Sequence, residues 1–317
     1  MATATKTRKP ATRKPVKARK PAREVTTELP MIDGKLDRAA LLKAALEMPG
    51  SISKAFNAFH RYSFLNMLLV FMQTGKVEPL GNFNAWKRKG RKVISGPGSA
   101  LFVNHPKPVY KRDEEGNVVR DENGKAVIAF VSFTPKATVF QLHQTEGPDL
   151  VYPELPDWDK DQALANLDIE QVPFADGDGN TQGYATGNKL AMNPVAAHPL
   201  PTMLHEMAHI VLGHTAKDKA ADYAAHRGVM EFQAEAVALL VAKELDVPGY
   251  NEAESRGYIQ HWLGHSAGDY TAWDDESEDS VLVEDSTITA IFNAVDKILV
   301  AGRKAHYEAL KEAEEAE

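Results

Sequence analysis

Residues 199–213 read PLPTMLHEMAHIVLG, and this stretch decides how the second half of the chain folds. Prolines suit the first turn of a helix, and Gly213 is a natural residue to follow the last turn. In such a helix His205 and His209 lie four residues apart and therefore share one face. Apart from Glu206, the residues between the prolines and Gly213 carry no formal charge, which predicts a helix packed in the interior.

The pattern His205-Glu206-x-x-His209 is typical of a metal site. Two imidazoles on one helical face can bind one ion, and the neighbouring Glu206 can take a proton from water as a general base. The alternative is a core helix whose histidines only form hydrogen bonds. An apolar helix with a clear start and stop, and acidic residues on a later helix, favour zinc binding through His205 and His209.

Three residues could supply a third ligand, namely His214, Glu231 and Glu235. His214 and Gly213 do not stand at the spacing of the pattern HExxHxxGxxH. Glu231 and Glu235 are four residues apart on an otherwise apolar helix predicted at 229–245, where an unpaired carboxylate would be costly. We therefore assign Glu231 as the ligand and Glu235 as hydrogen-bond acceptor from a ligating histidine. The reverse assignment and a solvated helix face remain the alternatives.

Two histidines and one glutamate leave the fourth zinc position open, as in catalytic zinc sites. The expected activity is that of a zinc-dependent metallopeptidase of the gluzincin type. Residues 183–193 are expected to form an edge strand against which a peptide substrate lies. A donor is needed for the oxyanion, and the candidates are Tyr184, His214, Tyr223, His226 and Tyr258.

Composition limits where the protein acts. The 317 residues include no cysteine, which excludes disulfides and cysteine-bound metals. No apolar run reaches the length of a membrane span, and the N-terminus lacks the apolar segment of a secretory signal. We expect a cytoplasmic protein with no membrane partner.

The charge is unevenly distributed. Residues 1–23 contain nine lysines and arginines and no acid, so the rest of the chain is more acidic than the net charge of −7 suggests. Residues 1–30 are expected to be a disordered basic tail because they contain too little apolar surface to fold. The tail could bind a polyanion or merely improve solubility.

The periodicity predicts an α+β protein in two parts. An N-terminal part at 31–147 combines helices with a small antiparallel sheet, and a C-terminal zincin-like part at 148–317 is mostly helical with a short sheet. Proline-rich residues 146–161 connect them. The expected helices span 36–48, 51–73, 160–167, 200–213, 219–226, 229–245, 252–263 and 285–315. The expected strands are 100–103, 126–133, 138–142, 169–174, 182–186 and 188–193.

A basic cluster lies in the N-terminal part. Five lysines and arginines surround Trp86, and further polar and aromatic residues lie on the preceding helix. Cations that follow phosphates and aromatic rings that stack on bases are typical of proteins that bind single-stranded nucleic acid. For Trp86 a core position is equally compatible with the sequence. The residues expected to contact DNA are Arg61, Tyr62, Asn66, Trp86, Lys87, Arg88, Lys89, Arg91 and Lys92.

Several motifs together resemble ArdC-like antirestriction proteins. They are Tyr62-Ser63…Asn66…Leu69…Gln73, Trp86…Gly90-Arg91…Val93…Gly96, Val139-Phe140…Gln144-Thr145-Glu146-Gly147, the His205–His209 pattern with Glu231 and Glu235, and Tyr258-Ile259…Trp262-Leu263.

This resemblance covers about residues 55–305. It implies an N-terminal domain that binds single-stranded DNA, a C-terminal metallopeptidase-like domain, and protection of incoming plasmid or phage DNA from restriction. Two other functions remain open. One is a regulatory zinc protease that cleaves a protein partner, and the other is a non-enzymatic DNA-coating protein with a structural metal.

Overall fold

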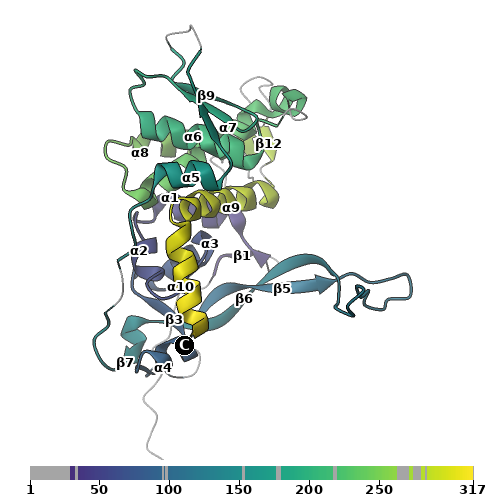
Figure 1. Cartoon of the computed structure of the whole chain (residues 1–317), viewed down its shortest axis with the longest axis vertical. Coiled ribbons are helices and arrows are strands. Elements are labelled where there is room, and N and C mark those ends of the chain that lie inside the picture. Colours follow the sequence, from purple (N-terminus) through teal and green to yellow (C-terminus); the bar gives the residue numbers. More distant parts are fainter. Residues whose placement is uncertain are drawn as a thin grey trace, which may run out of the picture.

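The structure is a computed structural model, and it combines helices with small sheets, so the predicted α+β class is confirmed (Figure 1). Residues 1–28 of the basic tail lie outside the described residues. Those residues are 29–32, 35–94, 96, 99–151, 154–175, 180–216, 220–262, 271–273, 280–282 and 284–316.

The first half of the chain contains short helices, a 3₁₀ turn and antiparallel strands. In chain order these are β1 (Met31–Ile32), β2 (Lys35–Leu36), α1 (Arg38–Glu47), α2 (Ser53–Phe56), α3 (Phe64–Thr74), β3 (Leu80–Asn82), α4 (Phe83–Arg88), β4 (Lys92–Val93), β5 (Leu101–Tyr110), β6 (Ile128–Gln141), η1 (Leu142–Gln144) and β7 (Thr145–Glu146).

The second half is mostly helical. Its elements are α5 (Lys160–Asn166), β8 (Glu170–Val172), β9 (Gly183–Thr186), β10 (Lys189–Met192), α6 (Pro199–Leu212), α7 (Ala220–Leu245), α8 (Glu252–Trp262), β11 (Thr271–Trp273), β12 (Ser280–Leu282), α9 (Asp285–Ala301) and α10 (Lys304–Ala316).

The predicted helix at 51–73 is wrong in one respect, because it is divided into α2 and α3. The side chain of Asn57 accepts a hydrogen bond from the backbone N–H of Tyr62 at 2.8 Å, which stabilises the turn between them. Ser63 then caps α3 by accepting from the backbone N–H of Asn66. Polar side chains that compete for backbone groups thus end one helix and begin the next.

Two helical boundaries in the second half also differ from the prediction. The helices expected at 219–226 and 229–245 are one continuous helix, α7. The helix expected at 285–315 is divided at Gly302 into α9 and α10. A Cβ on Gly302 would lie 2.4 Å from the ring nitrogen of Trp158, so only glycine allows this close approach.

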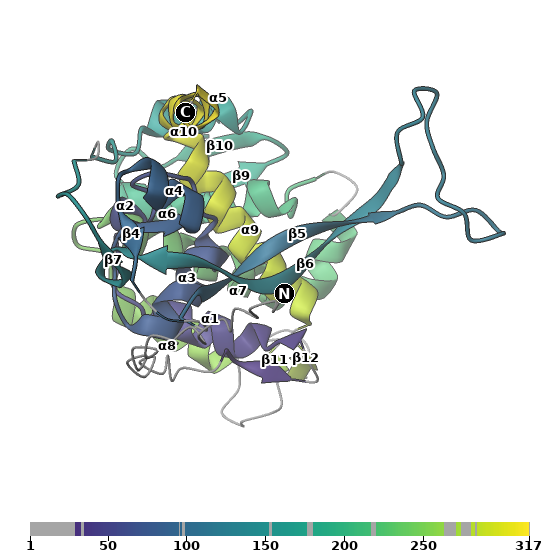
Figure 2. The same ribbon diagram turned by 90° about the horizontal axis from the view of Figure 1, so that it is seen from below.

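The strands β5 and β6 form a long antiparallel arm that projects from the body (Figures 1 and 2). The runs predicted as separate strands at 126–133 and 138–142 are joined in β6. Pro135 lies within β6, opposite Asn104 of β5, and does not end the strand. Sheet order is β3-β6-β5, which leaves β5 as an edge strand.

Helix α3 covers the open edge of β5 with two side-chain amides. Asn66 accepts from the backbone N–H of Asn104 at 2.7 Å and donates to its carbonyl at 3.3 Å. Gln73 accepts from the N–H of Phe102 at 2.8 Å and donates to its carbonyl at 2.9 Å. Each amide therefore replaces one peptide group of a missing neighbouring strand, which satisfies backbone groups that would otherwise be open.

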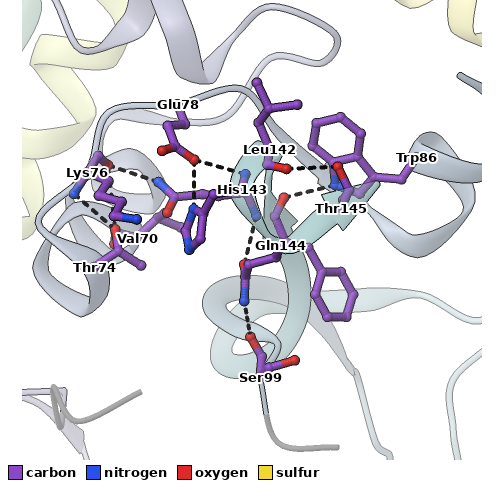
Figure 3. Close-up of polar contacts among 12 residues, drawn as sticks. Val70, Thr74, Lys76, Glu78, Trp86, Ser99, Leu142, His143, Gln144 and Thr145 are labelled. Atoms are coloured by element: carbon purple, nitrogen blue, oxygen red, sulfur yellow. Dashed lines mark hydrogen bonds and ion pairs between the residues drawn. The ribbon is translucent and has the colours of Figure 1, made fainter. Parts of the chain in front are cut away.

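A second set of polar contacts fixes the end of β6 (Figure 3). The carboxylate of Glu78 accepts from the backbone N–H of His143 at 3.1 Å and lies 2.7 Å from its Nδ1. The amide of Gln144 donates to the carbonyl of Ser99 at 2.7 Å. These contacts connect three loops that are distant in sequence, so the region after β6 is held by side chains more than by strand pairing.

One hydrophobic cluster includes residues from both parts of the chain. Helix α9 contributes Ile288, Ile291 and Phe292 and contacts α1 and α3 as well as α5, α6 and α7. The Phe292 ring lies 6.0 Å from that of Phe64 in α3. The core therefore has no break at 147/148, and the division into two domains stays a prediction.

The end of α7 also connects the two parts. Lys243 donates to the carbonyl of Leu46 at 2.7 Å, near the C-terminus of α1. The next residue, Glu244, accepts from the backbone N–H groups of Ile52 and Ser53, both at 3.1 Å, at the N-terminus of α2. A cation at one helix C-terminus and an anion at the next N-terminus are both favourable placements. None of the described helices has the length and apolar character to cross a membrane.

Candidate metal centre

Helix α6 presents the two histidines to α7. It begins with Pro199 in its first turn and ends at Gly213, which has a φ of 81° in the left-handed region. Met203, Leu204, Met207 and Ala208 are buried in the shared core, and α6 packs against α7. The imidazoles of His205 and His209 consequently face the helix that carries the predicted carboxylates.

Three atoms form a compact triangle. His205 Nε2 lies 3.1 Å from His209 Nε2 and 3.2 Å from Glu231 Oε2, and the last side is 3.6 Å. A tetrahedral zinc ion with bonds of about 2.0–2.1 Å holds its ligand atoms roughly 3.3 Å apart. The three donors therefore fit one small divalent ion, and together they form a group able to hold a metal.

Glu235 lies on the opposite side of the His205 ring. Its Oε2 is 3.1 Å from His205 Nδ1, and its Oε1 accepts from the hydroxyl of Tyr250 at 3.4 Å. Tyr250 also bonds Ser255 at 2.9 Å. The structure brings Glu231 and Glu235 to opposite ring nitrogens of His205. Their roles as ligand and hydrogen-bond acceptor stay predictions.

The charges of this group are strongly coupled. Burial lowers the pKa of His205, but its hydrogen bonds to Glu231 and Glu235 outweigh burial and raise the pKa to about 10. Burial raises the pKa of Glu235, and the hydrogen bond to His205 more than reverses this. In the metal-free protein a proton on His205 therefore occupies the place between carboxylates that a cation would take.

His214 does not belong to the triangle of ligand atoms. Its Nδ1 lies 3.0 Å from His209 Nδ1, and its Nε2 lies 3.0 Å from the side-chain oxygen of Gln233. Burial lowers the pKa of His214 to about 4, so the ring is neutral. Because its nitrogens contact His209 Nδ1 and Gln233 and lie outside the group of ligand atoms, His214 fits neither the role of third ligand nor that of oxyanion donor.

A cavity of about 600 Å³ opens in front of the triangle. Glu206 lines it together with the three residues that carry the ligand atoms, and β9 forms another wall. The segment predicted as an edge strand, 183–193, forms two strands in the sheet order β8-β10-β9. Its first part, β9, is at an edge, whereas its second part, β10, is the central strand. Burial raises the pKa of Glu206 above its ordinary value. A carboxylate of raised basicity thus lies in the same cavity as the donors for a metal.

Tyr184 is the oxyanion-donor candidate that the described part of the structure supports. It lies on β9 and lines the cavity, and its ring is 5.6 Å from that of Phe174. The side chains of Tyr223, His226 and Tyr258 lie outside the described residues.

Two aromatic residues that were predicted to contact DNA, Trp86 and Tyr62, lie in the interior, which argues against their contact with a base. Trp86 is 1% exposed, and its ring N–H donates to the carbonyl of Phe140 at 2.9 Å. Tyr62 is 8% exposed. Asn66 uses both polar atoms of its amide on the backbone of β5. None of the three can stack on or read a base in this arrangement, because the fold already uses their surfaces.

The charged residues of the cluster differ among themselves. Arg61 pairs with Asp296 at 2.8 Å, and Arg88 lies 3.6 Å from Glu314 of α10. Arg91 donates to Thr145 and to the carbonyls of Gly147 and Pro148.

The remaining lysines face outward to different degrees. Lys89 is half-buried, and its ammonium lies 4.8 Å from the ring centre of Phe59. Lys87 and Lys92 are exposed. Exposed charge in this segment is therefore smaller than the sequence suggested.

Sequence reasoning missed Gln233, which contacts His214, and the pair Tyr250 and Ser255, which lies beside Glu235. Gln233 is two residues from Glu231, a spacing that carries no helical signal for a shared face. Tyr250 and Ser255 follow the end of α7, so only tertiary packing brings them to Glu235.

No family model matches this sequence, and no curated protein is similar to it. Solved structures similar to the chain are those of the antirestriction ArdC protein from R388 plasmid. The metal-free structure has a TM-score of 0.43 and 14% identity, covering 87% of this chain and 97% of that chain. The Mn(II)-bound structure has a TM-score of 0.38 and 14% identity, covering 87% and 96%. These are structures of the protein group that the sequence motifs resemble. Both TM-scores are below 0.5, so the likeness assigns neither a function nor a residue role to this chain.

Proposed function

We propose that the chain is a zinc-dependent hydrolase that cleaves peptide bonds, with His205, His209 and Glu231 as ligands and Glu206 as general base. The observation that supports this most directly is the triangle of ligand atoms facing a cavity that also contains Glu206. Two imidazoles and one carboxylate are a donor set suited to zinc, and three protein ligands leave a position for water or substrate.

A bound zinc ion would supply a Lewis acid and lower the pKa of water. The chain's own residues supply the remaining steps. The Glu206 carboxylate accepts the proton of the attacking water, and its raised pKa makes it a better base near neutral pH. The proton then passes from Glu206 to the leaving amine. Tyr184 lines the cavity, and its hydroxyl is the donor we propose for the developing oxyanion.

The edge strand β9 offers a binding surface for an extended substrate. Its inner edge pairs with β10, from Lys189↔Thr186 to Met192↔Gly183. Its residues Gly183 to Thr186 line the cavity that contains Glu206. Backbone hydrogen bonds to such an edge hold a peptide with little dependence on its side chains. This arrangement favours peptides in extended conformation over folded substrates.

The test compares Glu206→Gln with Glu170→Gln, an exposed control on β8. Zinc content is measured by elemental analysis, and cleavage is measured on a library of fluorogenic peptides. We expect Glu206→Gln to keep its zinc and lose cleavage by at least about a hundredfold, since it removes the base and spares the ligands. Cleavage by Glu206→Gln at the wild-type rate would contradict the proposal. A wild type that binds zinc without cleaving any peptide would favour a structural metal.

We also propose that the N-terminal part binds single-stranded DNA, which the arm supports more than the aromatic residues of the cluster do. Alternate residues of β5 and their partners on β6 share one face, which carries Lys107, Lys136 and Phe130. Phe130 is 60% exposed. The paired part of the arm contains lysines and no acid, and exposed rings beside cations suit stacked bases and phosphates.

This second proposal is tested with wild type and a variant lacking residues 1–23. Fluorescence anisotropy is measured with labelled single-stranded and duplex oligonucleotides over a range of salt concentrations. We expect preference for the single strand, and a smaller salt slope without the tail. Complete loss of binding on deletion would assign all DNA affinity to the tail.

Protection of incoming plasmid or phage DNA from restriction is the wider role we propose, on the basis of the sequence motifs. It is tested by transfer of an unmethylated plasmid into a restricting host with and without the protein. A regulatory zinc protease remains the alternative if peptide cleavage is found without DNA binding.

A further inference from the structure

The second nitrogen of His209 has a partner whose role is not explained by the proposed reaction. We propose that His214 and Gln233 are positioning residues that hold His209 in the tautomer with its proton on Nδ1. The Nε2 lone pair of His209 is then directed at the metal. This inference rests on the proposed metal site, and it concerns how the chain prepares one of the ligands.

The order of donors and acceptors follows from the distances. Gln233 Oε1 can only accept, so the contact of 3.0 Å requires a proton on His214 Nε2. Only one proton fits in the 3.0 Å contact between His209 Nδ1 and His214 Nδ1, and His209 supplies it when its Nε2 binds the ion, so His214 Nδ1 offers its lone pair. His209 Nδ1 lies 3.0 Å from this lone pair and must therefore carry a proton. The remaining nitrogen of His209, Nε2, is left with its lone pair toward the ligand triangle.

The orientation of the Gln233 amide is itself determined by a neighbour. Its nitrogen donates to the backbone carbonyl of Thr287 at 3.4 Å. A carbonyl cannot donate, so turning the amide around would bring two oxygens together at Thr287. These contacts form a relay of hydrogen bonds from the carbonyl of Thr287 through Gln233 and His214 to His209. The relay connects the first turn of α9, helix α7 and the loop after α6.

The loop after α6 is built to return His214 to this position. Gly213 adopts a φ of 81°, and the backbone N–H of His214 donates to the carbonyl of His209 at 2.9 Å. The next residue, Thr215, donates its hydroxyl to the carbonyl of Gly187 at 2.6 Å and accepts from the Gly187 N–H through its own carbonyl. His214 is 7% exposed and His209 is 5% exposed. The contact between the two rings is thus fixed by backbone geometry and shielded from water.

The two ligating histidines are oriented by different chemistry. His205 faces the carboxylate of Glu235, whereas His209 faces a neutral ring and a neutral amide. Three carboxylates already surround the centre, those of Glu206, Glu231 and Glu235. A neutral relay fixes the second ligand without adding a fourth negative charge beside the ion.

The test compares His214→Gln with His214→Leu. Glutamine can still accept from His209 and donate to Gln233, whereas leucine fills similar space and can do neither. Zn²⁺ affinity is measured by competition with a chromophoric chelator. We expect His214→Leu to bind Zn²⁺ about 10–100-fold more weakly and His214→Gln to remain within about threefold of wild type. In histidine-selective ¹H–¹⁵N spectra, the hydrogen-bonded Nδ1 proton of His209 should be present in wild type and His214→Gln and absent in His214→Leu.

Equal affinity of both variants and wild type would overturn the inference while leaving the metal site intact. Equal weakening of both variants would also overturn it, because the acceptor would not be the cause. Wild type that binds no stoichiometric Zn²⁺ would end the proposed function as well. If His214→Leu does not fold, Gln233→Met tests the relay at the next hydrogen bond away from the ion, the one between Gln233 and His214. Its Zn²⁺ affinity should then fall about threefold or more, and an unchanged affinity would overturn the inference.

Discussion

The metal centre and the basic cluster at 61–92 both carry residues that suggested a function, and they differ in what the fold does with them. At the centre, His205, His209 and Glu231 direct donor atoms at one point beside a cavity. In the basic cluster, Trp86 and Asn66 direct their polar atoms at the backbone of the same chain. Donor atoms that converge on one point beside a cavity indicate a ligand site, whereas polar atoms that bond to the backbone of the fold indicate a scaffold.

The largest expected effect is on the metal centre. His205→Ala removes one of three ligands, so most of the zinc should be released, as measured by elemental analysis after dialysis. The matched control is His198→Ala, an exposed histidine just before α6. Zinc retained at the wild-type level by His205→Ala would place the ion elsewhere and remove the contrast between the two regions.

The next effect separates scaffold from binding surface on a single helix. Trp86→Ala should lower the free energy of unfolding by about 3–5 kcal/mol, because it removes a buried ring from α4. Phe83→Ala on the same helix removes a ring that is 57% exposed, and it should change stability by less than about 0.5 kcal/mol. Urea unfolding measures both. If Trp86→Ala instead weakened DNA binding without loss of stability, the ring would be part of the interface after all.

A smaller effect tests whether Asn66 serves the fold. Asn66→Ala leaves the N–H and carbonyl of Asn104 without their partner, which should cost about 1–3 kcal/mol in urea unfolding. Zinc content should stay at the wild-type level. Asn66→Asp keeps the acceptor and loses the donor, so it should fall between alanine and wild type. Stability equal to wild type in both variants would argue against the edge-covering role.

The smallest effect on stability should come from the exposed lysines. Lys87→Ala with Lys92→Ala, and separately Lys107→Ala with Lys136→Ala, should each change the free energy of unfolding by less than about 1 kcal/mol. The pair that binds single-stranded DNA should reduce the salt slope by roughly 0.7 for each phosphate that the variant no longer neutralises. The pair with no change in slope is not at the interface. No change for either pair would assign the DNA interface to other residues.

The candidate site could be found from sequence because helical spacing already fixes part of its geometry. His205 and His209 share a face of α6, and Glu231 and Glu235 share a face of α7, whatever the rest of the chain does. Helical spacing does not fix the directions of the side chains in the basic cluster in the same way. Composition cannot say whether Trp86 points inward. A tryptophan that stacks on a base and a tryptophan in the core can occur in the same kind of sequence segment.

The amino-acid sequence by itself determined the α+β class, the helix that carries two histidines and the acidic helix that faces it. Periodicity and helix end signals act over a few residues, so they are readable along the chain. Tertiary structure alone decided which ring nitrogen meets Glu231, where His214 and Gln233 lie, and that Trp86 belongs to the interior. Those outcomes depend on how distant segments pack, because each polar atom takes the partner that the whole fold brings within reach.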